Sequence, residues 1–299
     1  MRYAIAIFIT LFIGCSVAQC QLPVPAFAYQ KPPVQSKQLS SQIREGVRVS
    51  DLRISSIDGS EIAAYLVEPR GGCSTLRRRC AGVLMVHWYD PSASNANRSE
   101  FLPEAYDLAR HGAVSLLVDA MWAQPRWLEQ RNPADDYNAS VAQVKNLRRS
   151  LDVLLHRPGV DPSRIAVVGH DLGAMFGAIV AGVDRRVRAL VLMAGDPCLS
   201  DRYLLGQKLS AAREDAIKKR LSPLCPVLYL PRATGPVFLQ YANKDPFVSH
   251  QEAQLMANAA PEPKRVRFYD LSHELNRQAR IERMEWLMLR LHLRPSPEQ

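Results

Sequence analysis

The sequence predicts an α/β fold in which a mainly parallel, doubly wound sheet carries helices on both faces. Short apolar runs alternate with longer segments whose apolar residues recur at helical spacing. Several of the short runs are apolar at nearly every position, which is typical of strands buried on both faces. The 299 residues, 47% of them hydrophobic, suffice for one substantial core, so we expect one domain over residues 46–293 and a tail over residues 294–299.

The first residues are typical of a secretion signal. Arg2 precedes an apolar run over residues 4–13 that is too short to span a bilayer, and Ser16-Val17-Ala18 offers the small residues that signal peptidase requires. We therefore predict a signal peptide over residues 1–18 and a secreted or periplasmic protein with no stable membrane insertion after cleavage. The four residues that end at Cys15 loosely resemble a lipobox, so a lipoprotein is the less favoured alternative.

A lead-in and a hairpin come next. Residues 19–45 are rich in proline, glutamine and serine, and this composition predicts an extended lead-in. A hairpin should follow, because predicted strands over residues 47–57 and 61–67 flank the turn signal Asp58-Gly59. Further strands are expected at residues 83–86, 114–118, 165–168, 190–193, 237–240 and 266–269.

Helical patterns separate these later strands. They cover residues 101–111, 137–156, 174–180, 252–259 and 278–291. Because strands and helices alternate, a ligand should bind where the carboxyl ends of the strands meet. The interval over residues 195–236 is about forty residues long, which predicts a short lid instead of a full cap domain.

Cysteine usage fits an oxidising compartment. Apart from the two cysteines near the cleavage region, four remain, and they fall into the pairs Cys73 with Cys80 and Cys198 with Cys225. We predict a disulfide within each pair. A metal site is the alternative, but neither pair shows Cys-x-x-Cys or a histidine at ligand spacing, so we predict no metal.

The net charge of +9 is scattered. Short basic clusters stand at residues 77–79, 148–149, 185–186 and 218–220, without a long block or interleaved aromatic residues. Such scatter indicates solvated surface. We therefore expect a small-molecule substrate and neither a nucleic-acid nor a membrane partner, and the oligomeric state stays open.

The segment Gly169-His170-Asp171-Leu172-Gly173 lies between a predicted strand and a predicted helix. This pattern is typical of a nucleophile elbow, where a sharp strand-to-helix turn raises one side chain above the sheet. Gly169 and Gly173 leave room for the neighbouring backbone. Asp171 stands in the position of the nucleophile. A carboxylate is ionised at neutral pH, so it can attack an electrophilic carbon without first losing a proton.

From about residue 45 to residue 293 the chain resembles an α/β-hydrolase, whose catalytic residues follow in the order nucleophile, acid, histidine. The resemblance implies Asp171 as nucleophile, Asp245 as acid and His273 as histidine. Asp196 stays open as an alternative acid, because some relatives supply the acid from the preceding strand. The backbone N–H groups of Trp88 and Leu172 are implied as the oxyanion hole. Further candidates for the pocket lining are His87, Tyr89, Trp122, Trp127 and His170.

An aspartate nucleophile implies a covalent ester on Asp171, which a water activated by His273 then hydrolyses. Similar aspartate enzymes include haloalkane and haloacetate dehalogenases and epoxide hydrolases. Leu172, however, stands where the first two carry tryptophan or arginine. The interval over residues 195–236 is too short for the tyrosine-bearing helical cap of the third. The compact core is more similar to dienelactone hydrolases, which act on esters or lactones with serine or cysteine.

These observations predict a secreted, cofactor-independent hydrolase of a small electrophilic substrate, which is an ester or lactone, a halide or an epoxide. One alternative is esterase or lactonase chemistry of the dienelactone-hydrolase kind at the same site. The other is a catalytically silent binding protein with a hydrolase fold.

Overall fold

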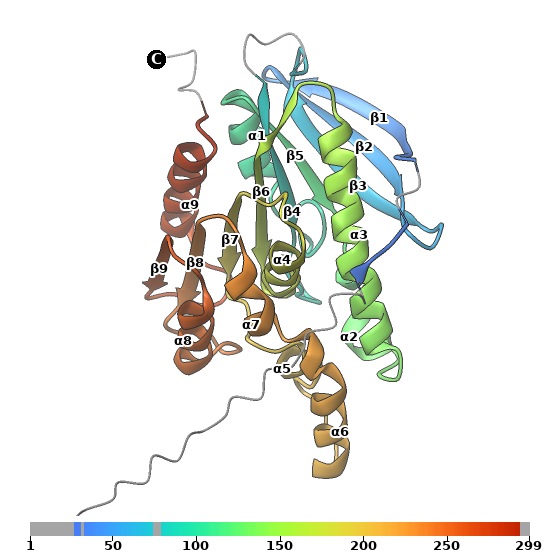
Figure 1. The fold of residues 1–299 in the computed structure, drawn as a ribbon, viewed down its shortest axis with the longest axis vertical. Helices are drawn as coiled ribbons and strands as arrows, with labels where there is room; N and C mark the ends of the chain where they lie inside the picture. The colour runs from blue at the N-terminus through green and yellow to red at the C-terminus, as the bar shows by residue number, and fades with distance from the viewer. Residues whose placement is uncertain (1–26, 31–32, 74–78, 294–299) are drawn as a thin grey trace, which may run out of the picture.

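A computed structural model describes residues 27–30, 33–73 and 79–293 (Figure 1). The predicted signal peptide over residues 1–18, the alternative lipidation site Cys15 and the tail over residues 294–299 lie outside the described residues. Strands of the described part form one sheet in the order β1-β2-β3-β5-β4-β6-β7-β8-β9. In the same part, no helix is long and apolar enough to cross a membrane.

The sheet begins with an antiparallel meander of β1 (Ser36–Arg44), β2 (Val47–Ser55) and β3 (Glu61–Pro69). β3 also pairs antiparallel with β5, and every later pair is parallel. The parallel strands are β4 (Cys80–Val86), β5 (Ala113–Val118), β6 (Val160–His170), β7 (Ala189–Met193), β8 (Val237–Ala242) and β9 (Lys264–Tyr269). The predicted mainly parallel α/β class is confirmed.

β1 corrects the expectation of an extended lead-in that reaches residue 45. All nine residues of β1 are exposed, so the strand forms through backbone hydrogen bonds to β2 and shows no apolar alternation. The turn to β2 uses Glu45 and Gly46, both with positive φ, as a tight hairpin requires. Ahead of it, Phe27 is buried and its ring packs edge-on against Tyr229, so the lead-in contacts the folded body at this residue.

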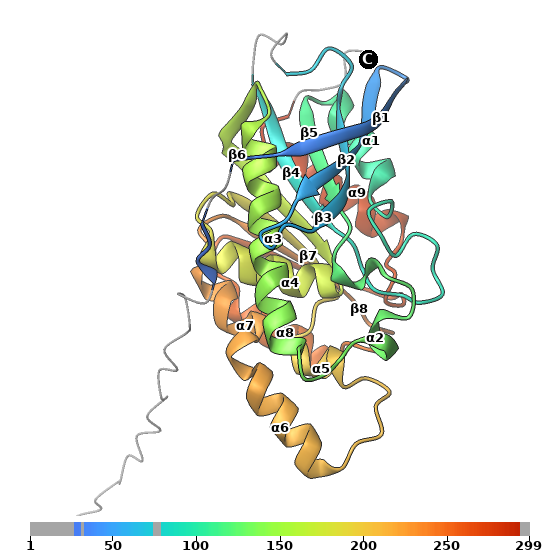
Figure 2. The same cartoon turned by 90° about the vertical axis from the view of Figure 1, so that its right-hand side faces the viewer.

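Helices cover both faces of the sheet (Figures 1 and 2). α3 (Asp136–His156) and α4 (Leu172–Val183) share a core with Leu84 and Val86 of β4. α1 (Leu102–Arg110) and α9 (Arg277–Arg290) share the opposite core with Val83 and Met85. This alternation along one strand is what a sheet buried on both faces requires. The remaining helical segments outside the lid are η2 (Met121–Ala123), α2 (Trp127–Gln130) and α8 (His250–Ala259).

The chain between β7 and β8 folds as a lid of short helices. These are α5 (Leu199–Tyr203), α6 (Ala211–Leu221), η3 (Ser222–Leu224), α7 (Pro226–Tyr229) and η4 (Leu230–Arg232). The disulfide Cys198–Cys225 joins the start of α5 to the start of α7. α6 extends away from the body of the molecule in both views, and its residues are mostly exposed (Figures 1 and 2).

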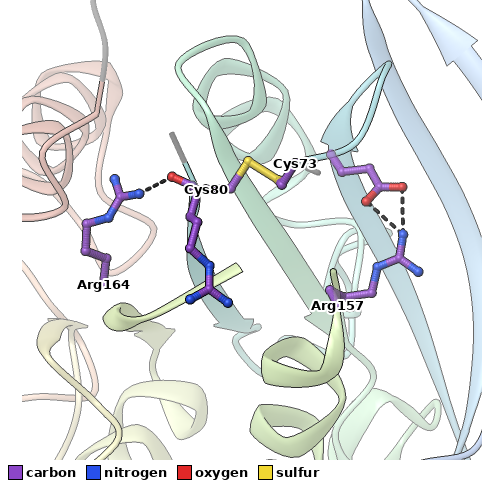
Figure 3. Close-up of a disulfide and its surroundings, with 6 residues drawn as sticks. Cys73, Cys80, Arg157 and Arg164 are labelled. Carbon is purple, nitrogen blue, oxygen red and sulfur yellow. Dashed lines mark hydrogen bonds and ion pairs between the residues drawn. A yellow bond between two sulfur atoms is a disulfide. The ribbon is translucent and has the colours of Figure 1, made fainter. Parts of the chain in front are cut away.

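The second disulfide, Cys73–Cys80, closes the segment before β4 (Figure 3). Close to it, Arg157 donates to both carboxylate oxygens of Glu68 at 2.9 Å, and Arg164 donates to the carbonyl of Arg79. Cys80 is the first residue of a parallel strand, so this disulfide lies at the amino end of the sheet, opposite the edge where a ligand should bind. Both predicted disulfides are thus present in the structure.

Reduction of the Cys198–Cys225 disulfide should increase proteolysis of the lid by at least about fivefold, because an intact tether restricts local opening of the exposed α6. Limited proteolysis with mass mapping of the cuts measures this rate. A variant with Cys73 and Cys80 changed to alanine separates the two disulfides, since it should respond to reductant as the wild type does. An unchanged cleavage rate over residues 199–230 would contradict the tether.

Candidate active site

The elbow places Asp171 between β6 and α4. Its φ of 55° and ψ of −119° form a conformation that side-chain-bearing residues rarely adopt. A Cβ on Gly169 would lie 2.2 Å from the carbonyl oxygen of Gly173, and one on Gly173 would lie 2.1 Å from that of Val86. Only glycine fits such approaches, so these two positions allow the sharp turn that presents Asp171.

His273, in the loop after β9, is aligned by Asp245. Its Nδ1 lies 2.8 Å and 3.0 Å from the two carboxylate oxygens of Asp245. The backbone N–H groups of Phe247 and Val248 also donate to this carboxylate. Burial raises the pKa of Asp245, but the bond and charge of His273 outweigh it and lower that pKa overall. An ionised acceptor keeps the proton on Nδ1, so Nε2 presents its lone pair to the site.

Nε2 of His273 faces the elbow. It lies 3.9 Å from Oδ1 of Asp171, which is too far for a hydrogen bond between them. Asp196, the alternative acid, lies elsewhere and contacts Arg202. The structure therefore brings together the three residues that the family order implied, with Asp245 and not Asp196 beside His273.

The loop after β4 holds the other carboxylate oxygen of Asp171. The backbone N–H of Tyr89 donates to Oδ2 at 3.0 Å. The N–H of Trp88, which the sequence predicted for the oxyanion hole, instead donates to Glu100 at 2.8 Å. Successive N–H groups point in different directions where the loop turns, so the donor is one residue further than predicted. Leu172, the other predicted donor, is buried as the first residue of α4.

Arg202 was missed by the sequence analysis. It comes from α5 in the lid, its side chain is only 4% exposed, and its Nη2 forms an ion pair with Oδ1 of Asp171. Its Nε lies 3.3 Å from Asp196, and the guanidinium lies 4.9 Å from the centre of the Phe247 ring. Burial raises the pKa of Asp196 well above its usual range, so Asp171 is the main counter-ion of Arg202.

His170 links the loop after β4 to the loop that carries His273. Nδ1 lies 2.7 Å from Glu100, and Nε2 lies 3.1 Å from the backbone carbonyl of His273. Burial lowers the pKa of His170, but the charge and hydrogen bond of Glu100, the charge of Asp171 and the bond to the His273 carbonyl together outweigh it and raise that pKa. Both ring nitrogens face acceptor oxygens, an arrangement that suits the imidazolium form. The Trp88 ring stacks on His170 at 5.2 Å, and the His273 ring lies 5.4 Å from it. Glu100 and His170 thus tie three loops together.

A cavity of about 520 Å³ lies at this edge of the sheet. Among the residues that line it are Trp88, Tyr89, Leu128, Arg202, Phe247 and His273. Asp171 has no exposed surface, whereas Arg202 and His273 both line the cavity and contact Asp171. In the described part of the chain, no group of three or more His, Cys, Asp or Glu side chains is arranged to hold a metal ion.

The other predicted lining residues lie behind the cavity wall. His170 is buried and is not among the residues that line the cavity. Trp122 is buried against Phe176, and Trp127 packs edge-on against Tyr89. His87 is buried, with Nδ1 2.7 Å from the carbonyl of Trp88 and Nε2 accepting from the N–H of Ala120 at 3.0 Å. These rings shape the loops that carry the lining residues.

His87 predicts a loss of stability in acid. Burial disfavours the charged ring and lowers the pKa of His87 from 6.5 to about 4. The neutral ring is also the form that can accept the Ala120 N–H at Nε2. The unfolded chain therefore takes up this proton first as the pH falls. By linkage the fold should lose about 3 kcal/mol between pH 6.5 and pH 4 through this group. Urea unfolding of wild type and His87→Gln across this range checks it, and identical pH dependence of the two proteins would contradict it.

Comparisons with known proteins support the fold. Residues 128–274 match the Dienelactone hydrolase family. An acetyl xylan esterase from Paenibacillus sp. R4 superposes with a TM-score of 0.73 at 19% identity over 89% of this chain and 92% of that one. A cold-adapted esterase from an Arctic intertidal metagenomic library gives 0.60 at 16% identity, over 85% and 99% of the two chains. At these identities the two structures show a shared fold.

A sequence relative is the polyketide transferase ATR5 of Stachybotrys chlorohalonatus. It is 30% identical over 139 residues, which make up 46% of this chain and 44% of that protein. The match therefore spans less than half of the relative's length.

Proposed function

We propose that the chain, which has the fold of α/β-hydrolase-like esterases, is a secreted, cofactor-independent hydrolase that opens a small electrophilic substrate through a covalent ester on Asp171. One observation carries the proposal. Asp171 stands at the elbow with Oδ2 held by the Tyr89 N–H and Oδ1 turned toward His273, whose other nitrogen is bonded to Asp245. The two disulfides support an oxidising compartment.

In the first half-reaction, Oδ1 of Asp171 attacks an electrophilic carbon of a substrate held in the cavity. A bond forms between Oδ1 and that carbon, and the bond from the carbon to its leaving atom breaks with both electrons on the leaving atom. The Tyr89 N–H fixes Oδ2, so the lone pairs of Oδ1 keep one direction. No general base is needed for this step, because the nucleophile is already a carboxylate.

In the second half-reaction, a water attacks the ester carbonyl carbon of Asp171. His273 Nε2 takes the proton of that water, and the charge of Asp245 stabilises the imidazolium that forms. The tetrahedral oxyanion develops at Oδ2, where the Tyr89 N–H already donates. Collapse breaks the bond between the ester carbonyl carbon and Oδ1, so the product alcohol leaves with Oδ1 and takes the proton from His273. The water oxygen replaces Oδ1, and the new carboxyl group releases its remaining proton to solvent, which restores the carboxylate.

A second candidate is esterase or lactonase chemistry at the same site. The match of residues 128–274 to the Dienelactone hydrolase family favours it, as do structural neighbours that are esterases. Attack of Asp171 on an acyl carbon would form a mixed anhydride, which His273 and water would hydrolyse in the same way. The two candidates differ in the adduct: an alkyl ester in one, an acyl group in the other.

Trapping the intermediate tests the proposal. A His273→Gln variant keeps an uncharged polar side chain but lacks the base, so whatever Asp171 captures should remain bound. We expect intact mass to show a stable adduct after exposure to one member of a panel of haloalkanes, haloacids, epoxides, lactones and activated esters. Peptide mapping should place it on Asp171.

The matched control is Asp171→Asn combined with His273→Gln, which should capture nothing. The mass of the adduct separates an alkyl ester from an acyl group. If the single variant captures nothing and the wild type turns over none of the panel, the proposal falls in favour of the silent binding protein.

A further inference from the structure

When a carboxylate attacks the substrate, the leaving atom takes up a negative charge that the site must stabilise. When Asp171 becomes an ester it loses its negative charge, and the leaving atom acquires one. The exposed lining of the cavity is mainly apolar, and its acidic residues Asp90, Glu129 and Glu274 repel an anion, so an unpaired anion there is costly. Leu172 offers no donor on its side chain.

Arg202 is placed to meet that charge. Its guanidinium contacts Oδ1, the attacking atom, and also lines the cavity from which the substrate must approach. The side chain is 4% exposed, so its attraction for an anion is little screened by solvent. A leaving atom pointing into the cavity would therefore find a buried cation next to the carbon under attack.

We propose that Arg202 stabilises the leaving group in the first half-reaction. Its guanidinium passes from Oδ1 of Asp171 to the departing anion as the ester forms. The inference rests on the proposed function and names its substrate class: electrophiles whose leaving atom departs as an anion, such as a halide or the oxygen of an opened ring. The total charge of Arg202, Asp171 and the substrate stays constant during the step.

The surroundings of Arg202 allow such a transfer. Nε is held 3.3 Å from Asp196 and the guanidinium lies over the Phe247 ring, so Nη2 can change partner with a small rotation. Burial raises the pKa of Asp196 against the lowering effect of Arg202, so this neighbour holds a charge less readily than an exposed aspartate and competes less for Nη2. After water has hydrolysed the ester, Asp171 regains its charge. A halide then leaves as such, an oxygen anion takes a proton from water, and the original ion pair returns.

A neutral residue at position 171 imitates the ester state and makes the inference testable without a substrate. Asp171→Asn removes the charge, so Arg202 should then bind a free anion in the cavity. We expect potassium bromide, titrated calorimetrically against a potassium fluoride background of equal ionic strength, to bind Asp171→Asn at least about tenfold more tightly than wild type. Asp171→Gly, which suits the positive φ of this position, should give the same result.

Two arginine variants complete the experiment. Adding Arg202→Gln to Asp171→Asn should abolish the bromide site. Adding Arg131→Gln should preserve it, because Arg131 is also buried and bonds to the lid carbonyl of Tyr203 but does not contact Asp171. Equal bromide affinity with and without Arg202, or no binding in either neutral variant, would overturn the inference. An adduct on Asp171 in His273→Gln with no bromide site would reject the role of Arg202 alone, whereas a bromide site without any adduct would reject the proposed function.

Discussion

An Asp171→Asn variant should lose at least about 10³-fold of the hydrolysis rate, which is the scale on which a covalent nucleophile contributes. The amide is a poor nucleophile, yet it has nearly the same shape. It can accept the Tyr89 N–H as Oδ2 does, and asparagine tolerates the positive φ of 55° at this position. The loss should therefore reflect chemistry and not a displaced elbow. Steady-state rates with the substrate identified by trapping measure it.

The control for this variant is a test that it is folded like the wild type. Near-ultraviolet circular dichroism and a cooperative unfolding transition should match the wild type, apart from a lower midpoint because Arg202 loses its main counter-ion. A folded Asp171→Asn protein with the full wild-type rate would show that another group attacks the substrate.

An Asp245→Asn variant should slow the second half-reaction by about 10³- to 10⁴-fold while the first proceeds. Asparagine can donate its amide N–H to Nδ1 of His273, which moves the ring proton to Nε2 and leaves no lone pair facing the water. The covalent ester should therefore accumulate, as a burst followed by slow turnover. Rapid-quench mass spectrometry of the adduct on Asp171 separates the two phases.

Asp196→Asn is the matched control, because Asp196 is the competing acid of the sequence analysis and contacts Arg202 instead of His273. It should show no accumulation of the ester. If Asp196→Asn accumulates the adduct and Asp245→Asn does not, the acid of the triad has been assigned to the wrong residue.

Features with a local cause were predictable from the sequence. Residues 165–168 of β6, for example, form an apolar run. The elbow that follows needs glycine at two fixed positions, where an added Cβ would lie 2.1–2.2 Å from a backbone oxygen. The order of Asp171, Asp245 and His273 could be transferred from the family resemblance because each follows a strand whose place is set by hydrophobic periodicity. The structure also pairs all four cysteines as their spacing suggested.

Features that depend on distant contacts were not predictable. β1 is exposed along its whole length and carries no apolar pattern. Arg202 stands in a polar lid segment, where nothing local distinguishes it from the exposed arginine at position 213. Its importance comes from Asp171 and Asp196, which only the fold places beside it. The contact of the Tyr89 N–H, and not the Trp88 N–H, with Asp171 was not predictable, because the direction of a backbone N–H depends on the turn of the loop and not on residue type.

The Glu100–His170 pair makes the frame of the site independent of its nucleophile. The pair holds the Trp88 N–H, the Trp88 ring and the His273 carbonyl, and none of these bonds uses the side chain of residue 171. A serine or a cysteine placed at position 171 would therefore leave these bonds in place, so the same frame suits a hydroxyl or a thiol there as well as a carboxylate.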